Sequence, residues 1–417
     1  VLLLVVFLSL FVCSARNESE IVWLKDVTTS LQTDKRKFSD PILPDNLTFQ
    51  LRGGSRAITL NLKRNHAIDP NADIYFVQKS NDGRFHLEKA LNLKKEELAY
   101  YQDRQNGAFM TVKCLRRSSG LCDRIINGNI QIEEINYDLQ PAKNDFTSRD
   151  VFDSPNLGTR YILRDQANIE GENVVPRHDT RTANIKQEVK GLFRQESFLC
   201  PKSTSRKGSR LLKRDNQKNI YYVEMAVVLE QGIWNFYYSL MMQRINSLVA
   251  DSEIKRKLRE VYSHMINGVD LRYKTIEDPD IEIIVRPREF YIFQNMEDFQ
   301  FRYTSVRLVK GKFQVDSEKY LYDLALWTRK FSQFSDHVML FTRYDLFDAP
   351  TGKIFSGRSY CGMVCDPTYK TSIVLSRDYF LTVRTAAHEL GHNLGADHDG
   401  EGNAKACRSE DRFLMSA

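Results

Sequence analysis

Three histidines and one glutamate near the carboxyl end of the chain have the spacing of a catalytic metal site. Residues 388–399 read H-E-L-G-H-N-L-G-A-D-H-D. Residues four positions apart lie on one face of a helix, so His388 and His392 can both face one metal ion. Glu389 follows the first histidine and is therefore placed beside the open coordination position, where a general base acts. The alternative, histidines that meet by chance near a helix end, does not account for the whole motif.

The residues that follow predict a third metal ligand. Gly395 can adopt a positive φ, which ends the helix and turns the chain back so that His398 reaches the same ion. Three protein ligands with one water are typical of catalytic zinc, whereas structural zinc has four protein ligands. Met415 lies where a methionine turn beneath the metal is expected, although a lone methionine is usually core filler. These residues predict a zinc cofactor with an open position for chemistry.

Apolar periodicity predicts the elements that hold this motif. The zinc helix is expected to bury a stripe with spacings of three and four, made by Phe380, Val383, Ala387, Leu390 and Leu394. Before it, alternating patterns predict strands at 221–229, 281–285, 338–342, 354–364 and 372–375, with helices at 233–248 and 320–331. Strands and helices that alternate in this way indicate an α/β layout.

The first half of the chain is expected to be rich in strands. Apolar residues alternate at 47–51 and again at 58–62, on either side of a Gly-Gly pair, which is typical of a β-hairpin. Cys114 and Cys122 flank a short loop and are predicted to form a local disulfide. Another strand is expected from residue 128 onward.

Composition places the chain among ordinary globular proteins. It has 417 residues, which favours two domains, with 42% hydrophobic and 27% charged residues. The formal net charge of +6 is mild, and no zinc-finger spacing or base-stacking motif is present, so no nucleic-acid partner is expected. No stretch of the sequence reaches transmembrane length, so no membrane span is expected in it.

The start of the chain has the features of a secretion signal. Residues 1–12 are apolar and residues 13–15 are small, which predicts a signal peptide at 1–15. It lacks an initiator Met, so it is expected to be truncated at its N-terminus; a buried apolar strand is the alternative. Six of the seven cysteines follow it, and Asn17 and Asn46 begin glycosylation sequons. A secreted, extracellular glycoprotein with disulfide bonds is therefore expected.

The segment 201–214 is predicted to be a processing linker. It carries six basic residues and no acidic residue, and such runs are usually solvated. Lys213 and Arg214 end it with a dibasic site, which predicts cleavage by a furin-type protease. Leu211 makes that match imperfect, because a basic residue is preferred four positions before the cut. A patch that binds heparin or nucleic acid is the alternative.

The zinc motif and the methionine turn resemble those of the metzincins. An aspartate directly after the third histidine, here Asp399, resembles the pattern of the reprolysin (adamalysin) branch. This branch includes the ADAM, ADAMTS and snake-venom enzymes. The form of residues 414–416 and their distance from Cys407 are most similar to secreted salivary reprolysins of ticks. The resemblance implies an α/β (α+β) metzincin catalytic domain at 215–417, with a central mixed sheet and a truncated C-terminus. It also implies a β-rich propeptide domain at 16–200.

The resemblance further implies roles for residues outside the motif. Cys200 is expected to act as a cysteine switch that ligates zinc in the latent form; its flanking residues match the usual motif poorly, and a disulfide is the alternative. Glu224 and Asp336 match calcium-binding positions, with ordinary surface acids as the alternative. Cys365 is expected to pair with a cysteine beyond residue 417. Asp399 is expected to anchor the returning loop through hydrogen bonds.

These features predict a secreted zinc metalloendopeptidase that is made as a zymogen. Zinc would polarise the substrate carbonyl, and Glu389 would take a proton from the attacking water and pass it to the leaving amine. An extended extracellular protein or peptide substrate is expected to pair with an edge strand at residues 359–363. The alternative is a catalytically silent binding protein with the same fold. It is disfavoured because all three histidines and Glu389 are present.

Overall fold

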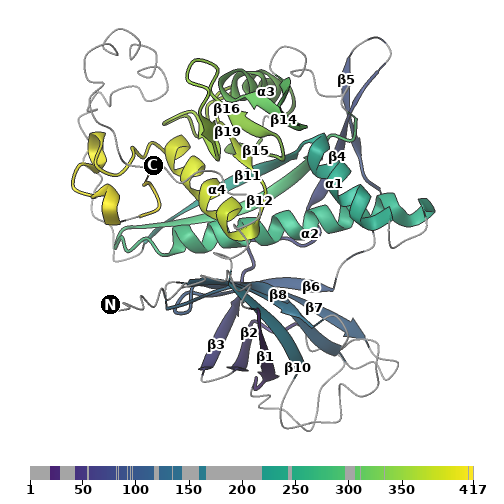
Figure 1. The fold of residues 1–417 in the computed structure, drawn as a ribbon, viewed down its shortest axis with the longest axis vertical. Helices are drawn as coiled ribbons and strands as arrows, with labels where there is room; N and C mark the ends of the chain where they lie inside the picture. Colours follow the sequence, from purple (N-terminus) through teal and green to yellow (C-terminus); the bar gives the residue numbers. More distant parts are fainter. Residues whose placement is uncertain are drawn as a thin grey trace, which may run out of the picture.

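The computed structural model describes residues 19–28, 43–165 and 218–416. Short gaps fall within these ranges at residues 54–55, 81, 83, 92, 94, 96, 117–121, 134, 143–158, 243–246, 296–305, 310, 333 and 412. Several sequence predictions lie outside the described residues: the signal peptide at 1–15, Asn17, Cys200, and the linker 201–214 with Lys213 and Arg214. The described chain has two parts, a barrel and a layered α/β body (Figure 1).

Eight antiparallel strands close into a barrel in the N-terminal part. In barrel order they are β1 (Ser19–Asp26), β10 (Thr159–Asp165), β9 (Ile135–Pro141), β8 (Cys122–Ile132), β7 (Ala108–Arg116), β6 (Leu98–Asp103), β3 (Arg56–Arg64) and β2 (Asn46–Gly53). The predicted hairpin is β2–β3, in which Leu47 faces Leu62 and Phe49 faces Leu60. All four side chains are buried in the barrel core, because alternate residues of a strand point to the same side.

A seven-stranded sheet forms the centre of the α/β body. Its order is β18 (Gly357–Ser359), β19 (Thr371–Leu375), β15 (His337–Thr342), β11 (Asn219–Leu229), β12 (Ile281–Ile292), β4 (Asp73–Lys79) and β5 (Phe85–Lys89). The five inner strands are parallel, and β18 and β5 run antiparallel at the two edges. β4 and β5 come from the chain between β3 and β6 of the barrel. The sheet therefore crosses the predicted division between residues 16–200 and 215–417.

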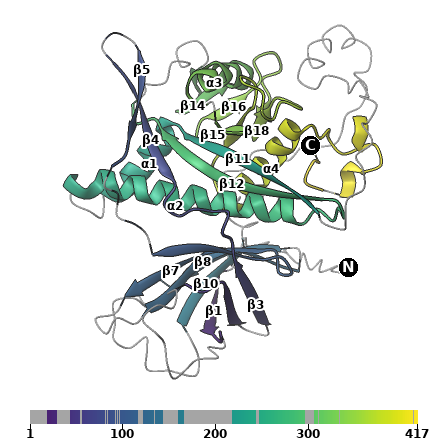
Figure 2. The same cartoon turned by 180° about the vertical axis from the view of Figure 1, so that it is seen from behind.

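Helices cover both faces of this sheet, as parallel sheets require (Figures 1 and 2). The helices are α1 (Gln231–Met242), α2 (Ser247–Lys274), α3 (Ser317–Phe331) and α4 (Tyr379–Leu394). Side chains of α1, α2 and α4 share one core with the sheet, and α3 packs into a second core on the opposite face. Within the described residues, none of the helices has the length and apolar content needed to cross a bilayer.

Short elements complete the body. A four-stranded sheet has the order β13 (Val306–Val309), β14 (Lys312–Asp316), β16 (Asp345–Phe347) and β17 (Ile354–Phe355). Two short 3-10 helices, η5 (Gly402–Ala404) and η6 (Ser409–Asp411), follow the zinc motif. The described chain is therefore a mixed α/β structure, as predicted.

Two predicted elements differ from the structure. The helix predicted across 233–248 is interrupted: α1 ends at Met242, and the 28-residue α2 begins at Ser247. The strand predicted at 354–364 is two short strands that end at Ser359. The chain then turns at Gly362, whose φ is +68°, and the Gly362 amide donates to the carbonyl of His392. Turn geometry and this contact with the end of the zinc helix prevent further strand pairing.

The zinc helix α4 is capped at both ends. Asp378 is the N-cap, and its side chain accepts a hydrogen bond of 2.7 Å from the amide of Leu381. Gly395 ends the helix with a φ of +103°, and its amide donates to the carbonyl of His392. This left-handed conformation favours glycine and turns the chain back over the last helical turn. Both caps fix the length of the segment that carries the histidines.

Replacement of the N-cap should destabilise the protein. Asp378→Ala is expected to lower the free energy of unfolding by about 1 kcal/mol, because the Leu381 amide loses its acceptor. Asp378→Ser keeps a side-chain acceptor and is the matched control. Urea unfolding followed by circular dichroism measures both, and equal midpoints for the two variants would contradict the capping role.

Candidate metal centre

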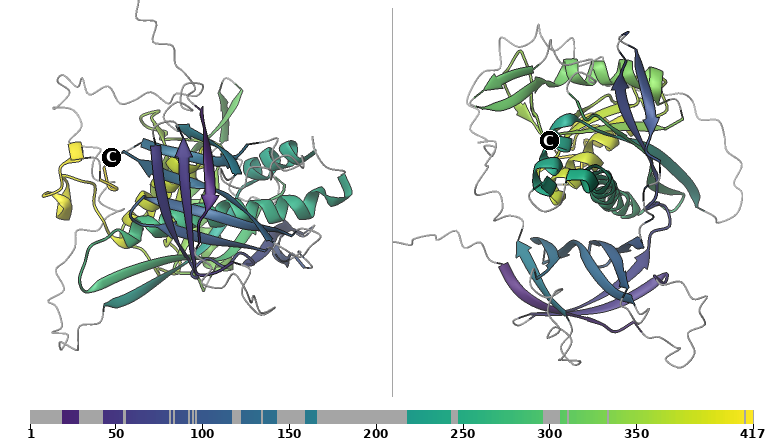
Figure 3. Two further views of the ribbon diagram at one scale, coloured as in Figure 1. Left: turned by 90° about the horizontal axis from the view of Figure 1, so that it is seen from below. Right: turned by 90° about the vertical axis from the view of Figure 1, so that its right-hand side faces the viewer.

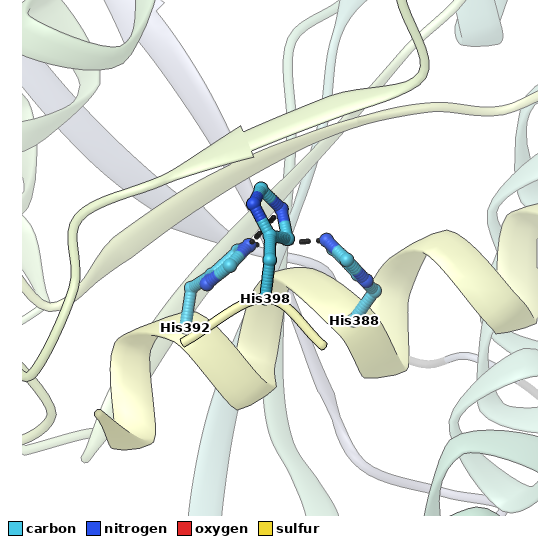
Figure 4. Close-up of side chains that lie close together, drawn as sticks. All are labelled: His388, His392 and His398. Carbon is cyan, nitrogen blue, oxygen red and sulfur yellow. Dashed lines mark hydrogen bonds between the residues drawn. The ribbon is translucent and has the colours of Figure 1, made fainter. Parts of the chain in front are cut away.

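The three histidines of the motif converge on one point (Figure 4). His388 and His392 lie one turn apart on α4, and His398 follows the turn after the helix. Nε2 of His392 lies 3.0 Å from Nε2 of His388 and 3.1 Å from Nε2 of His398. Among the described residues, these three form the only cluster of His, Cys, Asp or Glu side chains with metal-ligand spacing.

Backbone carbonyls fix the protonation of two of these rings. Nδ1 of His388 lies 2.8 Å from the carbonyl oxygen of Leu414, and Nδ1 of His392 lies 2.9 Å from that of Ala396. A carbonyl only accepts, so each Nδ1 carries the proton and each Nε2 presents a lone pair to the cluster. Burial lowers the pKa of His392 to about 4 and also lowers the pKa of His388. Both rings are therefore neutral at physiological pH, the form in which imidazole binds metal.

The cluster fits a zinc ion. The Nε2 lone pairs of His388 and His392, which lie 3.0 Å apart, repel each other unless a cation lies between them. Zinc–nitrogen bonds of about 2.0–2.1 Å are compatible with that spacing. No fourth His, Cys, Asp or Glu joins the cluster in the described part of the chain. That donor count is typical of catalytic zinc, where the fourth position is open to water.

Glu389 lies beside the cluster and is buried, with 5% of its surface exposed. It packs directly against the edge strand: a Cβ built on Gly357 would lie 2.6 Å from Oε1 of Glu389 and 2.7 Å from its Cγ. The φ of Gly357 is not positive, so this glycine provides room rather than an unusual backbone conformation. Sequence reasoning missed Gly357, because nothing in its strand pattern marks the contact.

Burial raises the pKa of Glu389 to about 8, and Arg358 opposes that rise. A cation at the histidine cluster would oppose it further, because a nearby positive charge favours the carboxylate. A carboxyl group whose pKa lies near neutrality can accept a proton and return it in the same reaction cycle. The position of Glu389 therefore suits a general base.

The free edge of the seven-stranded sheet runs past Glu389. β18 is the outermost strand and pairs on one side with β19. The prediction of an edge strand at 359–363 is wrong in its extent, because only Ser359 of that range belongs to β18. The edge beside the cluster begins two residues earlier, at Gly357. Its outer main-chain groups have the geometry that an extended peptide needs for strand pairing.

The methionine turn packs beneath the zinc helix. A Cβ built on Gly391 would lie 2.6 Å from Sδ of Met415, so the absence of a side chain at Gly391 lets the sulfur approach the helix. Asp399 joins the turn to the loop after His398: its amide donates to the carbonyl of Met415, and its carboxylate accepts a 2.8 Å hydrogen bond from Ser416. The same turn supplies the Leu414 carbonyl that holds His388.

Two further side chains position the zinc helix. Tyr273 on α2 donates a 2.8 Å hydrogen bond to the carbonyl of Ala387, the residue before the first histidine. Asn393 is fully buried; it donates to the carbonyl of Tyr360 and lies 3.0 Å from Nδ1 of His337. Asn393 stands inside the motif, but its partners are distant in sequence, so the sequence did not reveal its role.

The predicted calcium residues lie side by side but make other contacts. The carboxylate of Glu224 pairs with the guanidinium groups of Arg286 and Arg288 on β12. The carboxylate of Asp336 accepts a 2.9 Å hydrogen bond from the amide of Glu224. These two acids belong to no metal-like cluster of three or more ligands within the described residues. The calcium site stays a prediction.

The cysteines divide into bonded and free groups. Cys114 is disulfide-bonded, and Cys122 begins the adjacent strand β8, where it faces Arg116 of β7. The pairing of Cys114 with Cys122 itself stays a prediction. Cys361 is also disulfide-bonded. Cys365 and Cys407 are free thiols, and Cys365 is exposed.

Comparison with known proteins gives a family match at the histidine cluster. Residues 262–399 match the family described as Metallo-peptidase family M12B, reprolysin-like. Venom metalloproteinase 2 of Eulophus pennicornis is 27% identical over 181 residues, which cover 41% of this chain and 41% of that protein. The chain thus spans less than half the length of this relative.

A solved structure also aligns with the chain. The alignment with metalloproteinase-II from Bacteroides fragilis covers 89% of this chain and 84% of that protein's chain, with 14% sequence identity and a TM-score of 0.34. A score of that size supports no argument about a shared fold.

The family match and the geometry involve the same residues. The matched region begins in α2 and ends at Asp399, so it includes His388, His392, His398 and Glu389. Residues 262–399 of this chain are therefore similar to the reprolysin-type metallopeptidases of family M12B.

Proposed function

We propose that this protein is a secreted zinc metalloendopeptidase that hydrolyses peptide bonds of extracellular proteins and is made as a zymogen. The observation that carries the proposal is the convergence of three imidazole nitrogens beside a buried glutamate at the outermost strand of the sheet. Each part supplies one requirement of peptide hydrolysis: a cation site, a base, and a surface that aligns an extended chain.

The chain's own residues have separate tasks in the proposed mechanism. His388, His392 and His398 would hold a zinc ion, which supplies a Lewis acid and lowers the pKa of a water toward about 7. The outer edge of β18 would pair with the substrate backbone and fix the scissile carbonyl near the cluster. Glu389 would accept a proton from the attacking water and return it to the leaving amine. No side chain need act as a nucleophile.

A catalytically silent binding protein with the same fold is the competing function. Such a protein has no need for a base that is buried beside the metal ligands. In this chain Glu389 is present, and a side chain at Gly357 of the edge strand would clash with it. This pairing favours catalysis over binding alone.

Secretion and latency are parts of the same proposal. The venom origin of the relative supports an extracellular location, as do the predicted signal peptide at 1–15 and the sequons at Asn17 and Asn46. Asn46 is exposed at the start of β2, so its side chain is accessible to a glycan. Latency is proposed from the order of Cys200, the basic linker and the zinc motif along the chain.

Zinc should bind at one site per chain. We expect metal analysis of the purified protein to give one zinc per chain. His398→Ala should lower the zinc affinity at least 10-fold, because it removes one of three ligands. Loss of a residue that only hydrogen-bonds to a ligand already lowers metal affinity by about 10-fold or more. Peptide hydrolysis should disappear on chelation and return when zinc is added. Hydrolysis that persists after complete zinc removal would overturn the metal mechanism.

The proposed base can be tested separately from the metal. Glu389→Ala should lower kcat by about 10²–10⁴-fold, the usual contribution of a general base, while zinc content stays at one per chain. Gly357→Ala should lower kcat by about 10²-fold, because the new Cβ displaces the glutamate by roughly 1 Å.

Gly352→Ala is the matched control, because a Cβ at Gly352 meets no atom within 4 Å. It is expected to leave kcat unchanged, although its positive φ costs some stability. If Gly357→Ala retained the wild-type kcat, the edge strand would not position the base. If Glu389→Ala retained it, Glu389 would not be the base.

Cleavage of the linker should activate the enzyme. The uncut chain is expected to hydrolyse peptides slowly or not at all, and cleavage after Arg214 should raise the rate. If Cys200 is the switch, Cys200→Ser should weaken latency in the uncut chain, because a neutral hydroxyl is a far poorer zinc ligand than a thiolate. Equal activity of cut and uncut wild-type protein would refute the zymogen proposal.

A further inference from the structure

A hairpin from the barrel segment completes the catalytic sheet. β4 pairs in parallel with β12, so that Ile74 faces Phe290 and Phe76 faces Ile292, and β5 lies outside β4. β4 is thus an inner strand of the sheet, although the chain on either side of the hairpin belongs to the barrel (Figure 1). Without it, β12 would become an edge with unpaired main-chain groups.

This hairpin packs on both faces of the sheet. Ile74 and Phe76 join the core that α1, α2 and α4 form, and the ring of Phe76 meets that of Trp234 edge-on at 6.3 Å between centroids. Val77 joins the opposite core, which α3 covers. Phe76 and Val77 are 3% and 1% exposed. A strand that is buried on both faces is an integral part of a parallel sheet, not a loosely added edge.

Buried polar contacts join the barrel to α2. The carboxylate of Asp270 on α2 is fully buried, and it accepts hydrogen bonds from the amides of Asn65 (2.8 Å) and Gln102 (3.0 Å) of the barrel segment. In return, Asn267 of α2 donates to the carbonyl of Tyr101. Because buried polar groups require partners, these contacts define one docking geometry for the barrel.

The barrel supports the zinc helix through α2 rather than covering the histidines. A Cβ at Gly268 of α2 would lie 2.8 Å from the Phe109 ring of the barrel and 2.9 Å from Val383 of α4, so three layers meet closely at this glycine. Val383 lies in the first half of α4, and the zinc motif begins at His388. Figures 1 and 3 show the barrel and α4 on opposite sides of α2.

We infer that the segment 19–165 is a permanent structural subunit of the enzyme, which stays bound to residues 218–416 after the chain between them is cut. The occupant of the β12 edge is the β4–β5 hairpin of this same chain. The processed protein is then a two-chain complex, and activation does not require departure of the barrel. The cut after Arg214 comes from the proposed function; the association does not depend on catalysis.

Native size-exclusion chromatography after a designed cut tests this inference. The recognition site of a sequence-specific viral protease is placed within residues 202–214. The chain carries Glu389→Ala, so that it cannot digest itself, and the buffer contains a thiol reductant, so that the disulfide of Cys361 cannot join the fragments. The two fragments should co-elute at submicromolar concentration and separate only in urea. Separation in native buffer would overturn the inference, whether or not the uncut enzyme is active.

Matched substitutions in the hairpin segment identify the contact responsible. Phe76→Ala should lower the urea concentration at which the fragments separate, because it empties a packed site between β12 and α1. Leu91→Ala removes a side chain that is 73% exposed and should cause no shift. Gln102→Ala, which removes one donor to Asp270, provides a milder second variant and should shift the separation in the same direction. No shift with either Phe76→Ala or Gln102→Ala would contradict the proposed interface.

Discussion

The close approach of three imidazole nitrogens is the constraint on which the rest of the site depends. The Nε2 lone pairs of His388 and His392 repel each other, so the fold must hold these rings together before a cation binds. Two carbonyls do this for His388 and His392, and they come from the methionine turn and from the loop after the helix. Both segments are therefore part of the metal centre, although neither Leu414 nor Ala396 is itself a ligand. Their hydrogen bonds explain why Asp399, which ties the turn to the loop, belongs to the motif.

The second constraint is the distance between the base and the substrate. In the proposed mechanism, Glu389 would have to reach the attacking water while the edge strand holds the peptide. In this structure the glutamate packs against Gly357 of that same strand. A peptide paired with β18 would therefore be held at a fixed position relative to Glu389, and the proposed strand pairing and proton transfer would be geometrically coupled. A larger residue at Gly357 would move the Glu389 side chain away from the edge strand, although the strand and the carboxylate would both remain.

The sequence predicted what depends on local pattern and missed what depends on distant partners. The zinc helix, its glycine end and the β2–β3 hairpin follow from periodicity and turn residues, and the structure has them at the predicted positions. The length of β18 was wrong, because the Gly362 amide binds the end of α4 instead of a strand. The long α2 was also missed, since its polar residues, which break the apolar pattern, are those that contact the barrel. The burial of these polar residues of α2 can be recognised only in a structure that contains both the helix and the barrel.

The same reasoning explains why the β4–β5 hairpin could not be assigned from sequence. β4 has seven residues, and its partner on β12 is more than 200 positions away, so no local pattern indicates their pairing. Yet the family match begins at residue 262, after both β4 and the central strand β11. The matched region thus excludes three strands of this sheet, β4, β5 and β11. Parallel sheets are covered on both faces, and the sheet beside this histidine cluster includes strands that lie outside the matched region. The N-terminal segment is for that reason part of the catalytic fold, and its role extends beyond that of a removable inhibitor.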